Sequence, residues 1–537
     1  MRRTEHLGAR LLTTLGLAAS VAYLVWRATA SLAGSHLWLS LPALLVEIVA
    51  LLGAAVLAWA LWPLPQLPAV NGASAPAAAP LAATMDAVVR VQSQADHEVR
   101  ATLLALRSVR GLEHVVVVDL SARPAVALLA LEFQAVYAAT DPADHNGVQV
   151  MVAAVRTPYF LLLDAGDVPT HDIIERLHAQ AGPQVAVVQG LGTAFAPDSA
   201  EHGPGGRHEL EFERRALNPA LGARGCAAWT GSGSLVCTGA LDEIEIDGGN
   251  AVGAHWRFGA SLLAAGWRIA SPAETVVVVH RTVDSDAEVR GRRVQRAEAA
   301  RRTVYGRGGA LRISRHTVRQ RLALLAWAVR PLSGLRRALF VALLAVAVVA
   351  GAPPFQASTL TLVCLWLPAF LYTSLGLSLL SGWTLRPGDR TRASLQAMGP
   401  AWASLRATDA RWAVHVDRAR FGNPMAAPRR RPRTGVGVAG AVAVISLALV
   451  LRGVSERLTH TLPEVASAAL MAMLMVSLWV LGLSLDVLRV LARRTQLRRS
   501  VRVVSSLAAT LDDRAVSIVD VNALGAGLLS QTELGVG

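Results

Sequence analysis

The stretch Tyr159-Phe-Leu-Leu-Leu-Asp-Ala-Gly-Asp-Val-Pro169 decides the class of fold, because it is a short apolar strand that ends in carboxylates. Other short apolar runs of this kind are Val88–Val91, Val115–Asp119 and Val185–Gln189. Between them lie segments of helical spacing near 96–109, 122–136 and 170–180. Strands that alternate with helices predict a mostly parallel sheet with helices on both faces. We therefore expect an α/β domain.

Two of these strands end in an aspartate, Asp119 and Asp164. Ligands of such sheets bind at the carboxyl ends of the strands. Asp164 and Asp167, three residues apart on a turn, can hold Mg²⁺ that also contacts substrate phosphates. A turn with a helix-capping aspartate explains the same spacing equally well.

The composition places part of the chain in lipid. Hydrophobic residues make up 53% and charged residues 17% of the 537 residues, whereas a soluble domain is about 25% charged. This excludes a purely soluble enzyme and a long disordered chain. Crossing a bilayer takes roughly 20 apolar residues. The stretches that approach this length are 11–28, 37–62, 338–354, 358–380, 434–452 and 464–486.

Arginine orients these six predicted spans. The segment 381–433 carries eleven arginines and the segment 487–502 carries six, whereas 29–36 and 355–357 carry none. The arginine-rich side of a membrane protein is the cytoplasmic side. The net charge of +14 is then charge beside anionic lipid. We expect no nucleic-acid polymer as a partner, because no basic face interleaved with aromatic residues is apparent.

The predicted domains follow the chain in order. They are two transmembrane helices (1–62), a Pro- and Ala-rich linker (63–84), a cytosolic α/β domain (85–312), an amphipathic helix on the membrane surface (313–337), a transmembrane pair (338–380), a basic cytosolic or interfacial loop (381–433), a second transmembrane pair (434–486) and a tail (487–537). Glu47 lies within a predicted span, and we expect such a carboxyl to face the interior of the bundle.

This layout resembles that of the bacterial cellulose synthase catalytic subunit, a processive family 2 glycosyltransferase with a GT-A fold. The matching motifs are Asp119, LDAGDVPT (163–170), WTGSGSLVCTGALDEI (229–244) and ASLLAAGWRIA (260–270). The resemblance covers roughly residues 85–310. It implies a multi-pass protein of the bacterial inner membrane, with the α/β domain and both termini in the cytoplasm.

The resemblance also implies an activity, the transfer of a hexosyl unit from a UDP-sugar to a growing glycan with inversion. Asp119 would then lie beside the uracil, and Asp164 would bind Mg²⁺ or Mn²⁺. Gly166 stands where the family has its second metal-binding aspartate, so Asp167 would be the partner.

Other motifs depart from the family pattern. The catalytic aspartate of the T-E-D motif falls on His255, which could accept a proton near neutral pH; a lone histidine on a helix is more often structural. The Q-x-x-R-W motif is best matched to 301–305. There Val304 replaces the arginine, Tyr305 offers a face for the acceptor sugar, and Arg301 could contact the diphosphate. These losses favour an alternative, a catalytically inactive relative that serves as a membrane scaffold or regulator.

The tail resembles part of a PilZ domain. Arg498 and Arg502 fit the R-x-x-x-R motif, and Asp520, Asn522 and Gly525 fit D-x-S-x-x-G with Asn in the serine position. The resemblance implies binding of cyclic di-GMP, a flat dianion suited to paired arginines. Positive charge beside the membrane, followed by a strand and a turn, is the alternative. Only twelve residues follow Gly525, so we expect a partial PilZ-like domain.

Overall fold

The computed structural model describes residues 3–32, 36–63, 84–92, 94–140, 147–194, 208–245, 254–279, 286–306, 309–312, 315–350, 357–386, 389–390, 393–398, 440–448 and a few single positions after 450. In the tail it describes the backbone of 503–511, 514–522 and 525–530.

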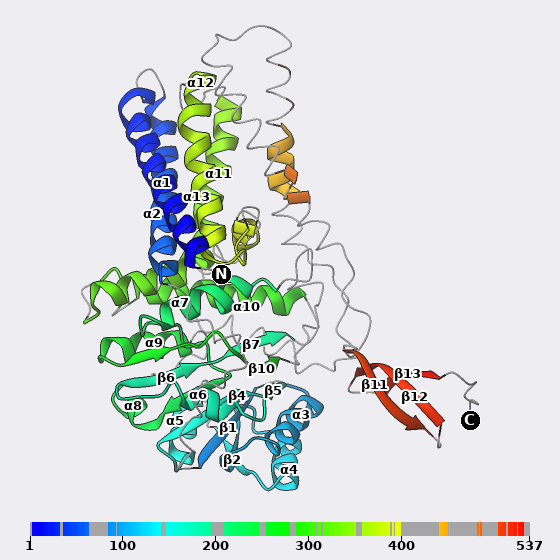
Figure 1. Ribbon diagram of the computed structural model, residues 1–537. Coiled ribbons are helices and arrows are strands. Elements are labelled where there is room, and N and C mark those ends of the chain that lie inside the picture. The colour runs from blue at the N-terminus through cyan, green and yellow to red at the C-terminus, as the bar shows by residue number, and fades with distance from the viewer. Residues whose placement is uncertain are drawn as a thin grey trace.

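Four long helices, α1 (Arg3–Trp26), α2 (Leu37–Leu61), α11 (Val318–Ala350) and α13 (Leu367–Leu380), stand together beside the α/β domain (Figure 1). Within the described part of the chain, three helical stretches are long and apolar enough to cross a membrane: His6–Ser31, Leu37–Leu61 and Val363–Leu380. They correspond to the predicted spans 11–28, 37–62 and 358–380. Membrane-spanning helices are thus consistent with the structure, while the six-span bundle stays a prediction.

The structure describes the other three predicted spans, 338–354, 434–452 and 464–486, to different extents. The segments 313–337 and 338–354, which we predicted as separate elements, belong mostly to the single helix α11. Its first half packs on the α/β domain, where Trp327 is buried in the main core. Its second half reaches α2, where Ala347 packs with Leu39. Of 434–452, residues 440–448 are helical; most of 464–486 lies outside the described residues.

The α/β domain is built on a seven-stranded sheet of order β3-β2-β1-β4-β8-β6-β9. Its strands are β1 (Met85–Val91), β2 (Leu112–Asp119), β3 (Val136–Ala139), β4 (Tyr159–Asp164), β6 (Val185–Gln189), β8 (Ser234–Cys237) and β9 (Arg268–Ala270). Every pair is parallel except the two that involve β8. The predicted mostly parallel sheet is confirmed.

Helices cover both faces of this sheet, because successive side chains of a strand point to opposite faces. Val89 and Val91 of β1 join a core with α3 (Asp96–Leu106), α4 (Pro124–Glu132) and α6 (Ile173–His178). Val88 joins a second core with α5 (Val148–Ala154), α7 (Asn218–Gly222) and α9 (Ala254–Ala264). This second core continues into the ends of α2, α11 and α13. The helical layer on that face therefore joins the sheet to the membrane helices.

Smaller elements complete the fold. A three-stranded sheet contains β5 (Asp167–Pro169), β10 (Thr275–Val279) and β7 (Leu191–Ala194). The remaining α-helices are α8 (Thr238–Asp242), α10 (Asp286–Tyr305) and the short α12 (Thr359–Thr361), and the π-helices are η1 (Arg27–Ser31), η2 (Glu213–Leu217) and η3 (Leu362–Trp366). The tail forms an antiparallel sheet of β11 (Val503–Leu511), β12 (Arg514–Asn522) and β13 (Gly525–Ser530).

Candidate functional site

The predicted site residues Asp119 and Asp164 lie at one edge of the main sheet. Asp119 ends β2 and pairs with Val91, while Asp164 ends β4 and pairs with Arg90. Both partners belong to β1, which runs between and parallel to the other two strands. The register therefore brings the two aspartates to the same carboxyl edge, where the topology of such sheets places ligands.

Asp119 is fully buried and organises the turn that follows β2. Its Oδ1 accepts the N–H of Ser121 at 2.9 Å, and its Oδ2 accepts the N–H of Arg123 at 2.7 Å. The hydroxyl of Tyr137 donates to the same Oδ2 at 3.3 Å. Burial, and then the charge of Asp119, raises the pKa of Tyr137. The carboxylate therefore shapes this loop, and its predicted contact with uracil stays a prediction.

Asp164 is paired with an arginine that the sequence analysis missed. Nε and Nη2 of Arg90 lie 2.8 and 2.7 Å from Oδ1 of Asp164. The Arg90 side chain is 12% exposed and that of Asp164 is 28% exposed, so the ion pair is partly shielded from water. Arg90 is the one charged residue in the run Val88–Val91. A charge in a buried strand is rare unless it is paired, so this arginine was the sign in the sequence that an ion pair forms here.

Arg90 also contacts His255, the residue on which the resemblance places the general base. Nη1 of Arg90 lies against Nε2 of His255. Arginine has only donors, so Nε2 must be the acceptor and the ring hydrogen must sit on Nδ1. Burial lowers the pKa of His255 well below its ordinary value, and the charge of Arg90 lowers it further. The imidazole is therefore neutral at pH 7, as a base requires.

Packing holds the His255 ring in place. The indole of Trp229 lies with its centroid 4.8 Å from the imidazole centroid. Gly231 has a φ of +101°, and a Cβ built there would come within 2.8 Å of Cδ2 of His255. A glycine is thus required both for the backbone conformation and for the space that the ring occupies.

Ser232, in the glycine- and serine-rich segment, joins the two acidic residues of the turn. Its Oγ accepts the N–H of Asp164 at 2.8 Å and donates to Oδ2 of Asp167. Thr102 supports the same turn, since its hydroxyl donates to the Asp167 carbonyl and accepts the N–H of Gly166, each at 2.9 Å. Gln189 donates to the carbonyl of Ser232 at 2.9 Å. These hydrogen bonds fix the positions of Asp164 and Asp167.

The donor atoms at this turn fit a hard divalent cation in part. Carboxylate oxygens are what Mg²⁺ prefers, and Oδ2 of Asp164 has no hydrogen-bond partner within the described residues. Its Oδ1, however, is bonded to Arg90, and Asp167 is nearly buried and accepts the Ser232 hydroxyl. Asp164 is thus the accessible ligand, and Arg90 competes for it.

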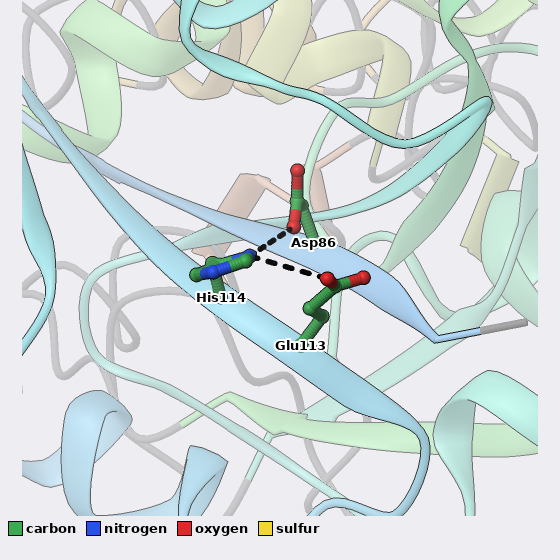
Figure 2. A group of neighbouring side chains, drawn as sticks. All are labelled: Asp86, Glu113 and His114. Atoms are coloured by element: carbon green, nitrogen blue, oxygen red, sulfur yellow. Dashed lines mark hydrogen bonds and ion pairs between the residues drawn. The ribbon is translucent and has the colours of Figure 1, made fainter.

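A second group of possible metal ligands lies at the opposite edge of the sheet. Asp86, Glu113 and His114 offer ligand atoms that all lie within 4.8 Å of one another (Figure 2). They come from the amino ends of β1 and β2. Asp86 is buried, and its Oδ2 already accepts the N–H of Arg156 at 2.8 Å, while His114 Nδ1 lies 3.3 Å from Oδ1. This group is separate from the edge that carries Asp119 and Asp164.

Arg301 and Tyr305, the predicted acceptor-side residues, lie at the C-terminal end of α10. This helix packs on α9, which carries His255, and on α11. Tyr305 is 54% exposed, so its ring face is accessible. Val304, where the resemblance would place an arginine, is buried.

Glu209 anchors α10 to the neighbouring segment. Nε and Nη2 of Arg293 lie 2.9 and 2.7 Å from Oε2 of Glu209, and Arg296 bonds Oε1. Burial alone would raise the pKa of Glu209, but the charges of Arg293 and Arg296 outweigh it and hold this pKa well below its usual range. Arg330 of α11 is bonded to Glu213 in the same segment. The segment near 209–213 thus links α10 to α11.

The PilZ-like residues are only partly described. Arg498 and Arg502 lie outside the described residues. Asp520 and Asn522 lie on β12, and Gly525 begins β13 opposite Asn522. β12 and β13 pair antiparallel, and the binding of cyclic di-GMP stays a prediction.

Glu47 of α2 lies opposite α1, as expected of a carboxyl that faces the helix bundle. Its Oε2 accepts Nε of Arg27 at 3.1 Å, and its Oε1 accepts the Tyr23 hydroxyl at 3.1 Å. Arg27 is fully buried and also donates to the hydroxyl of Ser31 at 2.9 Å. The ion pair joins α2 to the helical stretch His6–Ser31.

No family model matches the chain, and no curated protein matches it. Among solved structures, it is similar to a mannosyltransferase from Pyrobaculum calidifontis in complex with GDP-Man and Mn²⁺: 15% identical, covering 72% of this chain and 99% of that one, with a TM-score of 0.43. It is also similar to glucosyl-3-phosphoglycerate synthase from Mycobacterium tuberculosis in complex with Mn²⁺, UDP and glucosyl-3-phosphoglycerate: 13% identical, covering 40% and 78%, with a TM-score of 0.29. At these values the similarity assigns no activity to the chain.

Proposed function

We propose that the chain is a membrane-bound glycosyltransferase of GT-A fold, which transfers a hexosyl unit from a UDP-sugar to a growing glycan with inversion. The observation that carries this proposal is that Asp119 and Asp164 end the two strands on either side of β1, at the carboxyl edge of a mostly parallel sheet, and that Arg90 of β1 contacts both Asp164 and His255.

Each residue has one role in this proposal. Asp119, held by its own turn, lies beside the base of the nucleotide. Asp164, supported by Asp167, holds Mg²⁺ or Mn²⁺, which supplies positive charge to the departing diphosphate. Tyr305 supports the acceptor sugar, and Arg301 lies near it on α10.

His255 is the proposed base. Its Nε2 takes the proton of the acceptor hydroxyl while that oxygen bonds to the anomeric carbon, and the bond from this carbon to the diphosphate oxygen breaks. The nucleoside diphosphate leaves with the bonding electron pair. The neutral state of the imidazole at pH 7 supports this role, and its low pKa makes it a weak base, so we expect slow turnover.

A catalytically inactive relative is the second candidate, and one observation favours it. Oδ1 of Asp164 and Nε2 of His255 are both bonded to Arg90, so neither is available as the structure stands. In that case the fold would serve as a membrane scaffold or a nucleotide-responsive regulator.

Two finer features belong to the same proposal. The protein lies in a bacterial inner membrane with the α/β domain and termini in the cytoplasm, next to anionic lipid, and the glycan leaves through the helical part. The tail binds cyclic di-GMP through Arg498, Arg502, Asp520, Asn522 and Gly525. The segregation of arginine along the chain supports the first feature, and the β12–β13 hairpin is compatible with the second.

Membrane vesicles that contain the full chain test the activity. UDP or GDP release is measured with a panel of UDP-sugars and GDP-mannose, with Mg²⁺, Mn²⁺ or EDTA. We expect release that needs the cation and is lost in Asp164→Ala and reduced at least about tenfold in His255→Ala. Release that is the same in both variants would refute the site. Absence of release together with metal-independent or absent nucleotide binding would favour the inactive relative.

A further inference from the structure

Arg90 occupies the position between the two groups on which the proposed reaction depends. Its Nε and Nη2 are bonded to one oxygen of Asp164, and its Nη1 is bonded to Nε2 of His255. One oxygen of the Asp164 carboxylate and the lone pair of the proposed base are therefore taken by one guanidinium, whereas Oδ2 of Asp164 has no partner within the described residues. Arg90 must move before Asp164 can offer both oxygens to a cation and before His255 can accept a proton.

The charges of this trio cancel. Arg90 carries one positive charge, Asp164 one negative charge, and His255 is neutral, so these three side chains together carry no net charge. A nucleotide sugar brings two negative charges on its diphosphate. The planar fork of an arginine matches a diphosphate better than a point charge does. Arg90 has five N–H groups, and at least two of them have no partner within the described part of the chain.

The arginine that binds the diphosphate must come from a position other than the one that the resemblance implies. Val304, which stands where the resemblance expects the diphosphate-binding arginine, is buried and apolar. Arg301 on α10 is a rival, because its Nε has no hydrogen-bond partner within the described residues. Arg90 has the stronger claim, since it already touches Asp164 and His255 and lies at the strand end where the topology places ligands.

We propose that Arg90 is the residue that recognises the donor's diphosphate, and that its pairing with Asp164 and His255 is the donor-free arrangement of the site. This inference rests on the proposed function. When the diphosphate takes the guanidinium, Oδ1 of Asp164 becomes available to a divalent cation and Nε2 of His255 to the acceptor proton. Arg90 thus keeps the site inactive while no donor is bound, and it binds the diphosphate of the donor when the donor enters the site.

The inference has a thermodynamic consequence. If the diphosphate and Asp164 compete for Arg90, then a nucleoside diphosphate strengthens metal binding, and the metal strengthens nucleotide binding by the same factor. We expect a factor of about ten for a partly shielded ion pair. In Arg90→Met the restraint on Asp164 is gone, so Mn²⁺ alone binds more tightly while UDP without metal binds more weakly.

The experiment uses the full chain purified in detergent. Mn²⁺ binding is followed by the loss of the free Mn²⁺ signal in electron paramagnetic resonance, with and without UDP or GDP. UDP and GDP binding are measured by equilibrium dialysis in EDTA. The variants are Arg90→Met, Arg90→Lys, Arg301→Gln and, as a control, Arg100→Gln, an arginine of the same domain in an exposed ion pair with Glu132. Circular dichroism establishes that each variant is folded.

In Arg90→Met we expect Mn²⁺ to bind about tenfold more tightly without nucleotide, and UDP to bind at least about tenfold more weakly in EDTA. Arg90→Lys keeps the charge, so we expect its affinities for Mn²⁺ and UDP to lie between those of Arg90→Met and the wild type. If Arg90→Met does not fold, Arg90→Lys tests the role of Arg90 in its place. Arg100→Gln should behave as the wild type does.

Three results separate the possible failures. A wild type that binds UDP or GDP, with Arg90→Met unchanged in both assays, overturns the role of Arg90 and leaves the proposed function standing. Loss of nucleotide binding in Arg301→Gln alone assigns the diphosphate to Arg301 and also overturns it. A wild type that binds neither nucleotide, with or without Mn²⁺, overturns the proposed function and this inference together.

Discussion

Replacing Glu209 by glutamine tests how the acceptor-side helix α10 is held. Glu209 is 14% exposed and accepts hydrogen bonds from both Arg293 and Arg296. Glutamine keeps the shape but removes the negative charge that Arg293 and Arg296 share. Breaking a buried ion pair by removing one partner costs about 3–5 kcal/mol. For a domain of about 150–250 residues this lowers the melting temperature by roughly 6–20 °C, at about 2–4 °C per kcal/mol.

The assay is thermal unfolding of the detergent-purified chain, followed by tryptophan fluorescence, for wild type, Glu209→Gln and the control Glu132→Gln. Glu132 is in an exposed ion pair with Arg100, so its variant should unfold with the wild type. Because the pKa of Glu209 is held well below its usual value in the folded protein, its contribution is complete above the unfolded pKa of about 4.3. It is lost as the pH falls through the lowered folded pKa.

The gap between wild type and Glu209→Gln should therefore be constant from about pH 8 to pH 5 and narrow only in more acidic solution. Equal melting temperatures at pH 7, or a gap that shrinks as the pH rises, would refute the reasoning.

Three other substitutions probe the site and the membrane helices. Gly231→Ala places a methyl group within 2.8 Å of the His255 ring at a φ of +101°. We expect the free energy of unfolding to fall by about 1–3 kcal/mol, and we expect nucleotide release to slow because the His255 ring is displaced. Unchanged release would contradict a fixed position of His255. In Asp119→Asn the amide NH₂ replaces one carboxylate oxygen and points at a backbone N–H, so two donors face each other. We expect the free energy of unfolding to fall by about 1–3 kcal/mol, measured by thermal unfolding. An unchanged stability would contradict the hydrogen-bonded turn. Glu47→Gln leaves the buried Arg27 without its counter-ion and should lower the yield of folded protein from membranes, and the double variant with Arg27→Leu should recover part of it; no recovery would argue against a direct pair.

The candidate site shows which residues a sequence can locate and which it cannot. The strand ends Asp119 and Asp164 were predicted because apolar runs of strand length end in aspartates, and the local pattern is enough for that. Arg90 was missed, since its only signal was a charge inside a buried strand, and the sequence does not say which residue neutralises it. The ion pair to Asp164 and the contact with His255 join residues 74 and 165 positions apart. Such contacts are set by which strands are neighbours.

The membrane part shows the same division. Hydropathy alone identified the helices at 11–28, 37–62 and 358–380, because the bilayer fixes their length and composition. The merging of 313–337 with 338–354 into α11 was not foreseen, since the change from a basic amphipathic stretch to an apolar stretch suggested a boundary.

What the sequence determined by itself was therefore local: the alternation of strands and helices, the apolar spans, and the aspartates at strand ends, each of which depends on neighbouring residues. What only the tertiary structure decided was the strand order that places β1 between β2 and β4, and with it the single guanidinium that joins Asp164 to His255. The local sequence pattern is compatible with several strand orders, and long-range packing selects one of them. Only in that strand order does a buried charge such as that of Arg90 meet the residue that balances it.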